Sequence, residues 1–279
     1  MGCRRIEECF NGLSEREEKG LIVYLAAGDP DLETTALLVQ AAVEAGADMV
    51  EVGIPFSDPV ADGPVIQGAY ARALARGVKV AQILEMCADV RQRVQVPLIL
   101  MSYYNPIFRY GPGGFTRDAA AAGVDGLIVP DLPLEECGEL LRHADSRGLA
   151  LVPLVAPTTT EARLAAIADV ARGFVYCVSV TGVTGAREEI PPDLENFMLR
   201  VRRHVRLPCA VGFGIAGPFQ ARRVAPYCDA VVVGSALVAM AAGVPVGERE
   251  ALARRVELFV CEIKEALRQF WGGLEVAGV

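Results

Sequence analysis

Histidine and lysine are scarce in this 279-residue chain, and their scarcity excludes several kinds of catalysis. The only two histidines, His143 and His204, lie in polar helical segments. A Ser-His-Asp triad and a histidine-bound catalytic metal are therefore not expected. The lysines at positions 19, 79 and 264 do not end any predicted strand, which argues against a Schiff-base mechanism. Acid–base chemistry by carboxylates remains.

The chain also lacks the features of nucleic-acid-binding, membrane and secreted proteins. Its net charge is −8, and its only basic run, Arg200 to Arg206, reads as a solvated helix face. The eight cysteines show no C-x-x-C motif and no metal-ligand spacing. No signal peptide opens the sequence, and no apolar run could span a bilayer. We therefore expect a soluble cytoplasmic protein with reduced cysteines, no metal, and neither a membrane nor a nucleic-acid partner.

What the chain does contain is a repeated strand–helix pattern, with 52% apolar and 22% charged residues. The strands are continuously apolar, which is typical of strands buried on both faces. Eight βα units predict an α/β fold: one (β/α)8 TIM barrel domain over residues 1–279, with extra N-terminal and loop helices. A doubly wound open sheet is the alternative, because periodicity does not distinguish the two. The predicted strands are 21–26, 49–53, 98–102, 127–130, 149–154, 174–178, 209–212 and 230–234. The predicted helices are 4–18, 31–45, 64–75, 79–94, 113–122, 134–147, 159–171, 193–205, 217–225 and 246–270.

Three carboxylates stand out in the stretch E-V-G-I-P-F-S-D-P-V-A-D-G-P, residues 51–64. Glu51 lies inside an apolar strand, where an unused carboxylate is costly. It acts on a substrate or is a structural carboxylate bonded to backbone N–H groups. Asp62 serves chemistry or caps the helix that begins near Pro64. Asp58, in S-D-P, favours a turn-forming role.

Glycine-rich loops follow the last three predicted strands, at residues 181–187, 212–215 and 234–235. In a (β/α)8 barrel, chemistry lies in the loops at the C-terminal ends of the strands, and phosphate often binds after strands seven and eight. Glycines allow backbone N–H groups to approach an anion closely. Each glycine could also simply form a tight turn. Their occurrence at three consecutive strand ends favours a phosphate site, to which Ser235 could add a hydroxyl.

Taken together, these segments resemble the tryptophan synthase alpha chain family. The motifs fall in the family's order across residues 21–235: Y-L-A-A-G-D-P, E-V-G-I-P-F-S-D-P-V-A-D-G-P-V-I-Q, Y-N-P-I, L-I-V-P-D-L-P, S-V-T-G-V-T-G-A-R and V-G-F-G-I. The resemblance implies a carbon–carbon lyase of tryptophan biosynthesis that cleaves indole-3-glycerol phosphate to indole and glyceraldehyde 3-phosphate. It also implies an αββα heterotetramer, in which indole passes to a beta chain that carries pyridoxal phosphate. This chain itself would carry no cofactor.

The resemblance also implies roles for individual residues. Glu51 would protonate indole C3 and relay the hydroxyl proton, Asp62 would accept from the indole N–H, and Tyr176, which could equally be a core tyrosine, would line the site beside them. The phosphate would be held by Gly185, Gly214, Gly234 and Ser235. The indole would be walled by Tyr24 and Leu100. Closure would be transmitted between subunits by loop 55–60 with Asp58 and loop 182–190 with Thr184.

Three other functions remain open from the sequence. A stand-alone indole-3-glycerol phosphate lyase would have the same active site. A catalytically silent activating subunit is disfavoured by the presence of both Glu51 and Asp62. A phosphate-binding isomerase is disfavoured because a Lys/His catalytic set is missing. The sequence departs from the family in the glycine-rich residues 111–115 and in its C-terminal tail, which could change the partner surface.

Overall fold

The computed structural model describes residues 2–178, 193–212 and 214–268. Within them the strands form one parallel sheet in the order β5-β4-β3-β2-β1-β9-β8-β7-β6. Each strand from β1 to β5 and from β6 to β9 lies beside the next one in sequence, and the first strand, β1, lies beside the last, β9. The reversal of strand order that a doubly wound sheet requires does not occur in this sheet. The predicted barrel is therefore confirmed and the open sheet is excluded. The strands are β1 (Gly20–Ala26), β2 (Met49–Gly53), β3 (Leu98–Met101), β4 (Gly126–Ile128), β5 (Ala150–Val152), β6 (Leu154–Val155), β7 (Val175–Val178), β8 (Cys209–Gly212) and β9 (Ala230–Val233).

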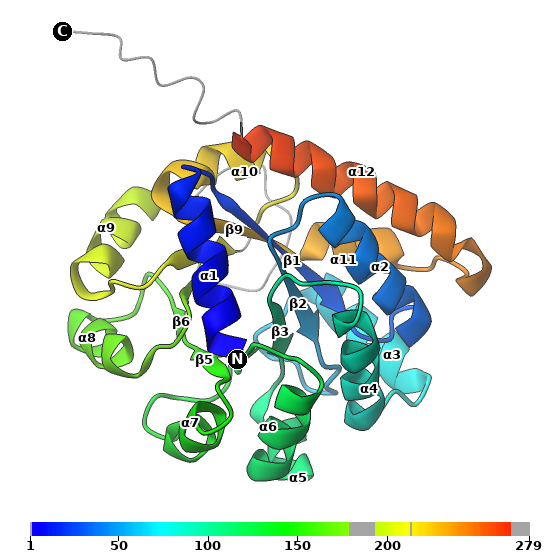
Figure 1. Ribbon diagram of the computed structural model, residues 1–279, viewed down its shortest axis with the longest axis horizontal. Helices are drawn as coiled ribbons and strands as arrows, with labels where there is room; N and C mark the ends of the chain where they lie inside the picture. The colour runs from blue at the N-terminus through cyan, green and yellow to red at the C-terminus, as the bar shows by residue number, and fades with distance from the viewer. Residues whose placement is uncertain (1, 179–192, 213, 269–279) are drawn as a thin grey trace, which may run out of the picture.

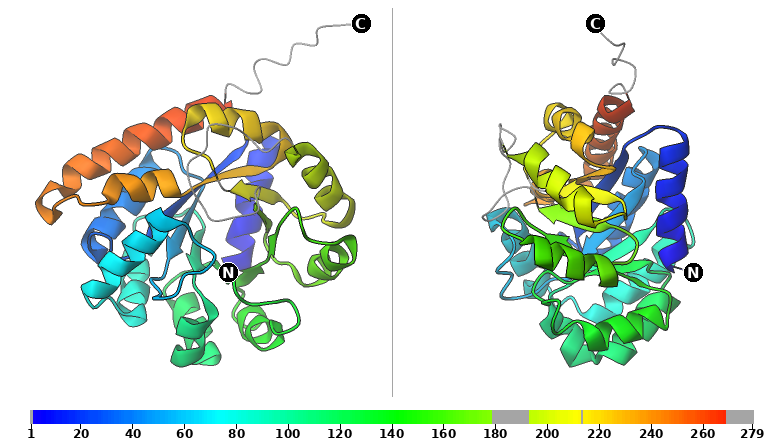
Figure 2. Two further views of the ribbon diagram at one scale, coloured as in Figure 1. Left: turned by 180° about the vertical axis from the view of Figure 1, so that it is seen from behind. Right: turned by 90° about the vertical axis from the view of Figure 1, so that its left-hand side faces the viewer.

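Helices surround this sheet on its outer side (Figures 1 and 2). Most agree with the predicted segments to within a few residues, but the short helices α5 and α11 were not predicted. The α-helices are α1 (Gly2–Glu15), α2 (Leu32–Glu44), α3 (Pro64–Ala75), α4 (Val80–Arg91), α5 (Tyr104–Tyr110), α6 (Pro112–Ala121), α7 (Gly138–Asp145), α8 (Glu161–Val170), α9 (Leu194–His204), α10 (Pro218–Val224), α11 (Ser235–Ala241) and α12 (Arg249–Arg268). Two short 3-10 helices are η1 (Ala225–Tyr227) and η2 (Val246–Glu248).

The fifth predicted strand is interrupted at Pro153. Its first part, β5, pairs with β4, whereas its second part, β6, pairs with β7. Proline has no backbone N–H and cannot donate to a strand ladder. The single strand predicted over 149–154 is therefore two short strands, one at each edge of the nine-stranded sheet.

Successive residues of each strand face opposite sides of the barrel wall, although both sides are apolar. Val23, Val52 and Leu100 pack with the core between strands and helices. Ile22 and Ile99 instead belong to the cluster inside the barrel. This alternation decides which residues reach the lumen, and an apolar strand sequence conceals it.

Helix α1 closes the end of the barrel at which the strands begin, and Figure 1 shows it lying across this end. Ile6, Phe10 and Leu13 of α1 pack into the inner cluster, where the ring centroids of Phe10 and Phe174 are 5.7 Å apart. Burial of these side chains holds the helix against the barrel. The open end, and the site that it contains, lies at the opposite side.

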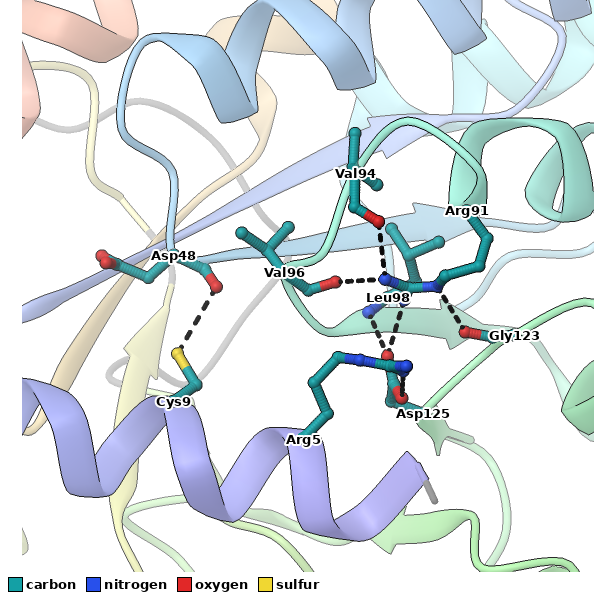
Figure 3. Close-up of polar contacts among 9 residues, drawn as sticks. All are labelled: Arg5, Cys9, Asp48, Arg91, Val94, Val96, Leu98, Gly123 and Asp125. Atoms are coloured by element: carbon teal, nitrogen blue, oxygen red, sulfur yellow. Dashed lines mark hydrogen bonds and ion pairs between the residues drawn. The ribbon is translucent and has the colours of Figure 1, made fainter.

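Polar contacts fasten α1 around the buried side chain of Asp125, which precedes β4 (Figure 3). Asp125 accepts hydrogen bonds from the Leu98 N–H at 2.8 Å and from Arg91 at 2.7 Å, and it also pairs with Arg5 of α1. The guanidinium of Arg91 donates further to the carbonyl oxygens of Val94, Val96 and Gly123. Every charged group in this cluster therefore has its partners in the fold.

Candidate active site

A pocket opens at the C-terminal ends of the strands, and it unites most of the residues singled out from the sequence. Seven predicted residues line it: Tyr24, Glu51, Asp62, Tyr176, Gly214, Gly234 and Ser235. Apolar side chains complete the lining: Ile66, Met101, Ile128, Leu154, Ile215 and Val232. A mostly apolar pocket with a few converging polar groups is the usual form of a small-molecule site.

Glu51 points into this pocket from β2, next to Tyr24, its register partner on β1. Its side chain is buried, and its Oε2 has no hydrogen-bond partner among the described residues. Burial, and then the charge of nearby Asp62, raises the pKa of Glu51 to about 8. A buried carboxyl oxygen without a partner disfavours a structural role and suits a group that exchanges protons with a ligand.

Asp62 reaches the same pocket from the loop between β2 and α3. The Tyr103 hydroxyl donates to Asp62 Oδ2 at 2.8 Å and itself accepts from the Ala61 N–H at 2.9 Å. Burial raises the pKa of Asp62 to about 6, and the hydrogen bond from Tyr103 acts in the opposite direction. The N-cap of α3 is Gly63, without a side-chain cap, so the alternative of Asp62 as the helix cap is wrong.

The loop 55–60 lies beside the pocket and exposes Asp58 to solvent. The carbonyl of Asp58 accepts from the Val60 N–H at 2.9 Å, and its carboxylate accepts from the Ser57 hydroxyl. These bonds fit the turn-forming role expected from S-D-P. The predicted intersubunit role of Asp58 stays a prediction. Thr184 and Gly185 lie outside the described residues.

The phosphate-binding residues predicted after the last two strands line one side of the pocket. Gly214 has a φ of +81°, a backbone conformation that favours glycine. Gly234 and Ser235 lie where β9 passes into α11. A Cβ on Gly234 would lie 3.2 Å from the Cβ of Tyr24, so this glycine also makes room for the tyrosine ring. The tight-turn and phosphate interpretations are thus compatible at these positions.

Leu100 does not reach the pocket. It belongs to the core between strands and helices, whereas its neighbour Ile99 faces the lumen. From β3, the pocket is lined by Met101 instead. The prediction that Leu100 walls the ligand is therefore corrected to Met101, because the alternation of the strand turns Leu100 outward.

Two tyrosines near the carboxylates had no role in the sequence-based prediction. Tyr103 bonds to Asp62, and the Tyr70 hydroxyl lies 2.6 Å from that of Tyr24. Tyr103 belongs to the Y-Y-N-P segment after the third predicted strand, a strand-end position that could have signalled it. Tyr70 had no such signal, because it lies inside a helical segment. Among the described residues that line the pocket there is no histidine or lysine.

No helix in the described part of the chain is long and apolar enough to cross a membrane.

Comparison with known proteins gives a consistent result along the chain. Residues 10–268 match the family described as tryptophan synthase alpha chain. The tryptophan synthase alpha chain of Caldanaerobacter subterraneus subsp. tengcongensis is 47% identical over 94% of this chain and 99% of its own. That of a Geobacter species is 53% identical over 84% and 88%. The crystal structure of tryptophan synthase subunit alpha from Legionella pneumophila superposes with a TM-score of 0.86, at 36% identity, covering 95% of this chain and 98% of that one.

Proposed function

We propose that this chain, which belongs to the tryptophan synthase alpha chain family, uses Glu51 and Asp62 to perform the family's reaction, the cleavage of indole-3-glycerol phosphate to indole and glyceraldehyde 3-phosphate. The family assignment confirms the resemblance inferred from the motifs and makes the chain a lyase of tryptophan biosynthesis. The observation that carries the assignment of residues is the buried Oε2 of Glu51, which has no partner among the described residues and lies beside Asp62 in an apolar pocket.

Glu51 acts first as an acid and then as a base. With a pKa of about 8 it is protonated at neutral pH, so it can deliver a proton to indole C3. The indolenine cation that forms is the electron sink. The Glu51 carboxylate then takes the proton of the hydroxyl on the adjacent side-chain carbon. The bond between that carbon and C3 breaks, its electrons return to the ring, and an aldehyde leaves. The carboxyl group regains its proton in the cycle.

Asp62 stabilises the positive charge that develops on the indole ring. With a pKa of about 6, it is ionised at neutral pH and can accept a hydrogen bond from the ring N–H. The bond from Tyr103 favours this ionised form and fixes the direction of the carboxylate. The two carboxyl groups thus have different protonation states in one pocket, which suits one acid and one anion.

The remaining lining residues would bind the two ends of the substrate. We assign the phosphate to Gly214, Gly234 and Ser235, together with Gly185 outside the described residues. Met101 and Ile128 would contact the indole together with Tyr24, and Tyr176 would lie beside the carboxylates. The support for this arrangement is the position of these residues around one pocket.

The assembly is proposed from the family. The chain would form one barrel domain over residues 1–279 and act in the cytoplasm as the alpha chain of an αββα heterotetramer. The beta chain would carry pyridoxal phosphate, and this chain would carry no cofactor. The loops with Asp58 and Thr184 would transmit closure between the subunits. A stand-alone lyase with the same site is the alternative.

An indole-release assay tests the proposal. The purified chain is supplied with indole-3-glycerol phosphate, alone and with a beta chain, and Glu51→Gln serves as the matched variant. We expect indole from the wild type, at a higher rate with the beta chain, and weak binding of the dephosphorylated substrate. Absence of indole under both conditions would favour a silent barrel, and equal affinity for the dephosphorylated compound would exclude the phosphate site. A rate that does not change with the beta chain would favour the stand-alone lyase.

A further inference from the structure

A pair of buried tyrosine hydroxyls lies at the edge of the pocket. The hydroxyl oxygens of Tyr24, on β1, and Tyr70, on α3, are 2.6 Å apart. The two side chains are 3% and 1% exposed. Burial raises the pKa of both phenols well above 10, so both remain protonated and can act as hydrogen-bond donors.

Gly53 provides the space for this pair. A Cβ at this position would lie 2.1 Å from the Tyr24 hydroxyl oxygen and 2.6 Å from that of Tyr70. Both distances are far below van der Waals contact, and tyrosine rings cannot bend aside as a flexible chain end could. Gly53 follows Glu51 by two residues in β2, on the same face of the strand. The hydroxyl pair therefore lies over the strand that carries the proposed acid–base group.

The hydrogen bond between the two hydroxyls leaves one of their two protons unused. Two hydroxyls bring two protons, and the bond between them uses one. Among the described residues neither the Tyr24 hydroxyl nor the Tyr70 hydroxyl makes another hydrogen bond. Tyr24 lines the pocket, whereas Tyr70 is not one of the described lining residues. If Tyr70 donates to Tyr24, the second proton points into the pocket, where a ligand can accept it. The opposite direction would leave a buried donor without a partner, which is costly.

We propose that Tyr70 donates to Tyr24 and that the Tyr24 hydroxyl binds the substrate by donating its proton to an oxygen of the glycerol chain. This inference rests on the function proposed above. It makes Tyr24 a polar recognition residue in addition to a wall for the indole, and Tyr70 a residue that positions it.

The chemistry of the substrate selects the glycerol chain as the acceptor. The indole ring has an N–H donor and no oxygen, so it cannot accept this proton in its plane. The phosphate is assigned beside Gly234. A Cβ on this glycine would meet the Cβ and ring edge of Tyr24, at the other end of the side chain from its hydroxyl. The glycerol hydroxyls lie between these two ends of the substrate and are hydrogen-bond acceptors.

Hydroxyl deletions in both enzyme and ligand test the inference. Two constants are measured for the wild type, Tyr24→Phe, Tyr70→Phe and the double variant. The first is kcat/KM for indole-3-glycerol phosphate. The second is the inhibition constant of a deoxy analogue, in which a three-carbon chain without hydroxyls joins indole and phosphate. We expect Tyr24→Phe to lower kcat/KM by about tenfold and to leave the inhibition constant unchanged, because only the natural substrate has an acceptor. Tyr70→Phe should have a smaller effect and none in the Tyr24→Phe background.

The matched control is Tyr110→Phe, which removes a tyrosine hydroxyl that donates to Asp118 on α6. Neither residue is among the described residues that line the pocket, so this variant should change neither constant. Equal weakening of substrate and analogue by Tyr24→Phe would overturn the inference, because a misshapen pocket would produce it. An unchanged kcat/KM would also overturn it. If the wild type neither turns over the substrate nor binds the analogue, the proposed function itself is contradicted. This result can be distinguished from the two above, because they concern only the effect of Tyr24→Phe.

Discussion

The two ends of the barrel each bury a carboxylate and surround it in opposite ways. At the end closed by α1, Asp125 accepts from the Leu98 N–H and pairs with the guanidinium groups of Arg5 and Arg91. At the open end, Glu51 Oε2 has no partner among the described residues. Burial raises the pKa of both groups. Around Asp125, donors and cations counteract this effect, whereas around Glu51 a second carboxylate adds to it.

This contrast distinguishes a carboxylate with a structural role, Asp125, from Glu51, for which we propose a catalytic role. A buried charge whose partners are all provided by the protein joins the elements that provide them, here α1, α4 and β3. A buried carboxyl group that lacks partners destabilises the folded state and persists where a ligand uses it. The comparison therefore predicts opposite responses to substitution at the two ends.

The largest effect is expected for Glu51→Gln. Turnover should fall by roughly a hundred- to ten-thousandfold, because the amide can neither donate the C3 proton nor accept the hydroxyl proton. Stability should respond in the other direction. Since the folded state raises the pKa of Glu51 from 4.5 to about 8, the wild type loses stability as the pH rises through this window. At pH 8 the variant should be more stable, by up to a few kcal/mol.

Indole release and urea unfolding at pH 5 and pH 8 measure both responses. The stabilisation should shrink at pH 5, where the wild-type carboxyl group is mostly protonated in the folded state. A variant that is inactive and also less stable at pH 8 would assign Glu51 to the fold, as at Asp125.

The next effect is expected for Asp125→Ala, with the opposite pattern. Removing this carboxylate leaves Arg91, which is 13% exposed, without its ionic partner. The free energy of unfolding should fall by about 3–5 kcal/mol, while the folded fraction keeps its activity. The control is Glu8→Ala on α1, the helix that also carries Arg5. It breaks an exposed pair with Arg4 and should leave the free energy of unfolding nearly unchanged. Loss of turnover in folded Asp125→Ala would show that the closed end also controls the site.

The sequence predicted the barrel, although the strand order was needed to exclude an open sheet, and it identified the residues whose chemistry is unusual in their context. Glu51 and Asp62 could be selected because a carboxylate in or beside an apolar strand requires an explanation. Leu100 could not be placed, because Ile99, Leu100 and Met101 are all apolar and the strand is buried on both faces. In such a strand, hydrophobicity does not reveal which side chains face the lumen.

Contacts between distant segments were also beyond sequence reasoning. The tyrosine pair depends on how α3 lies against β1, and the bond from Tyr103 to Asp62 joins two loops. No local pattern encodes either contact. The paired cluster around Asp125 was missed for the same reason: Arg5 and Asp125 are 120 residues apart in the chain.

A third prediction concerns the pH dependence of the wild type. The proposed mechanism requires ionised Asp62 and protonated Glu51, whose pKa values are about 6 and about 8. The kcat/KM should rise through the lower value and fall through the higher one, and both limbs belong to the coupled pair. Stopped assays of indole release from pH 5 to pH 9 measure the profile. A kcat/KM that keeps rising above pH 8 would contradict the acid role of Glu51, because the carboxyl group would then act in its ionised form from the start.

The smallest effect is expected for Tyr103→Phe, which changes one hydrogen bond and leaves both carboxyl groups in place. The Tyr103 hydroxyl donates to Asp62 and lowers its pKa, so its removal should move the acidic limb of the profile upward by about one unit or less. Stability should fall by about 1 kcal/mol, the usual net value of one hydrogen bond. The profile of Tyr110→Phe should match the wild type. An acidic limb that does not move in Tyr103→Phe would mean that burial alone sets the protonation of Asp62. At the open end, no described hydrogen-bond partner would then shift the pKa of either carboxyl group. At the closed end, by contrast, Asp125 is paired by the protein itself.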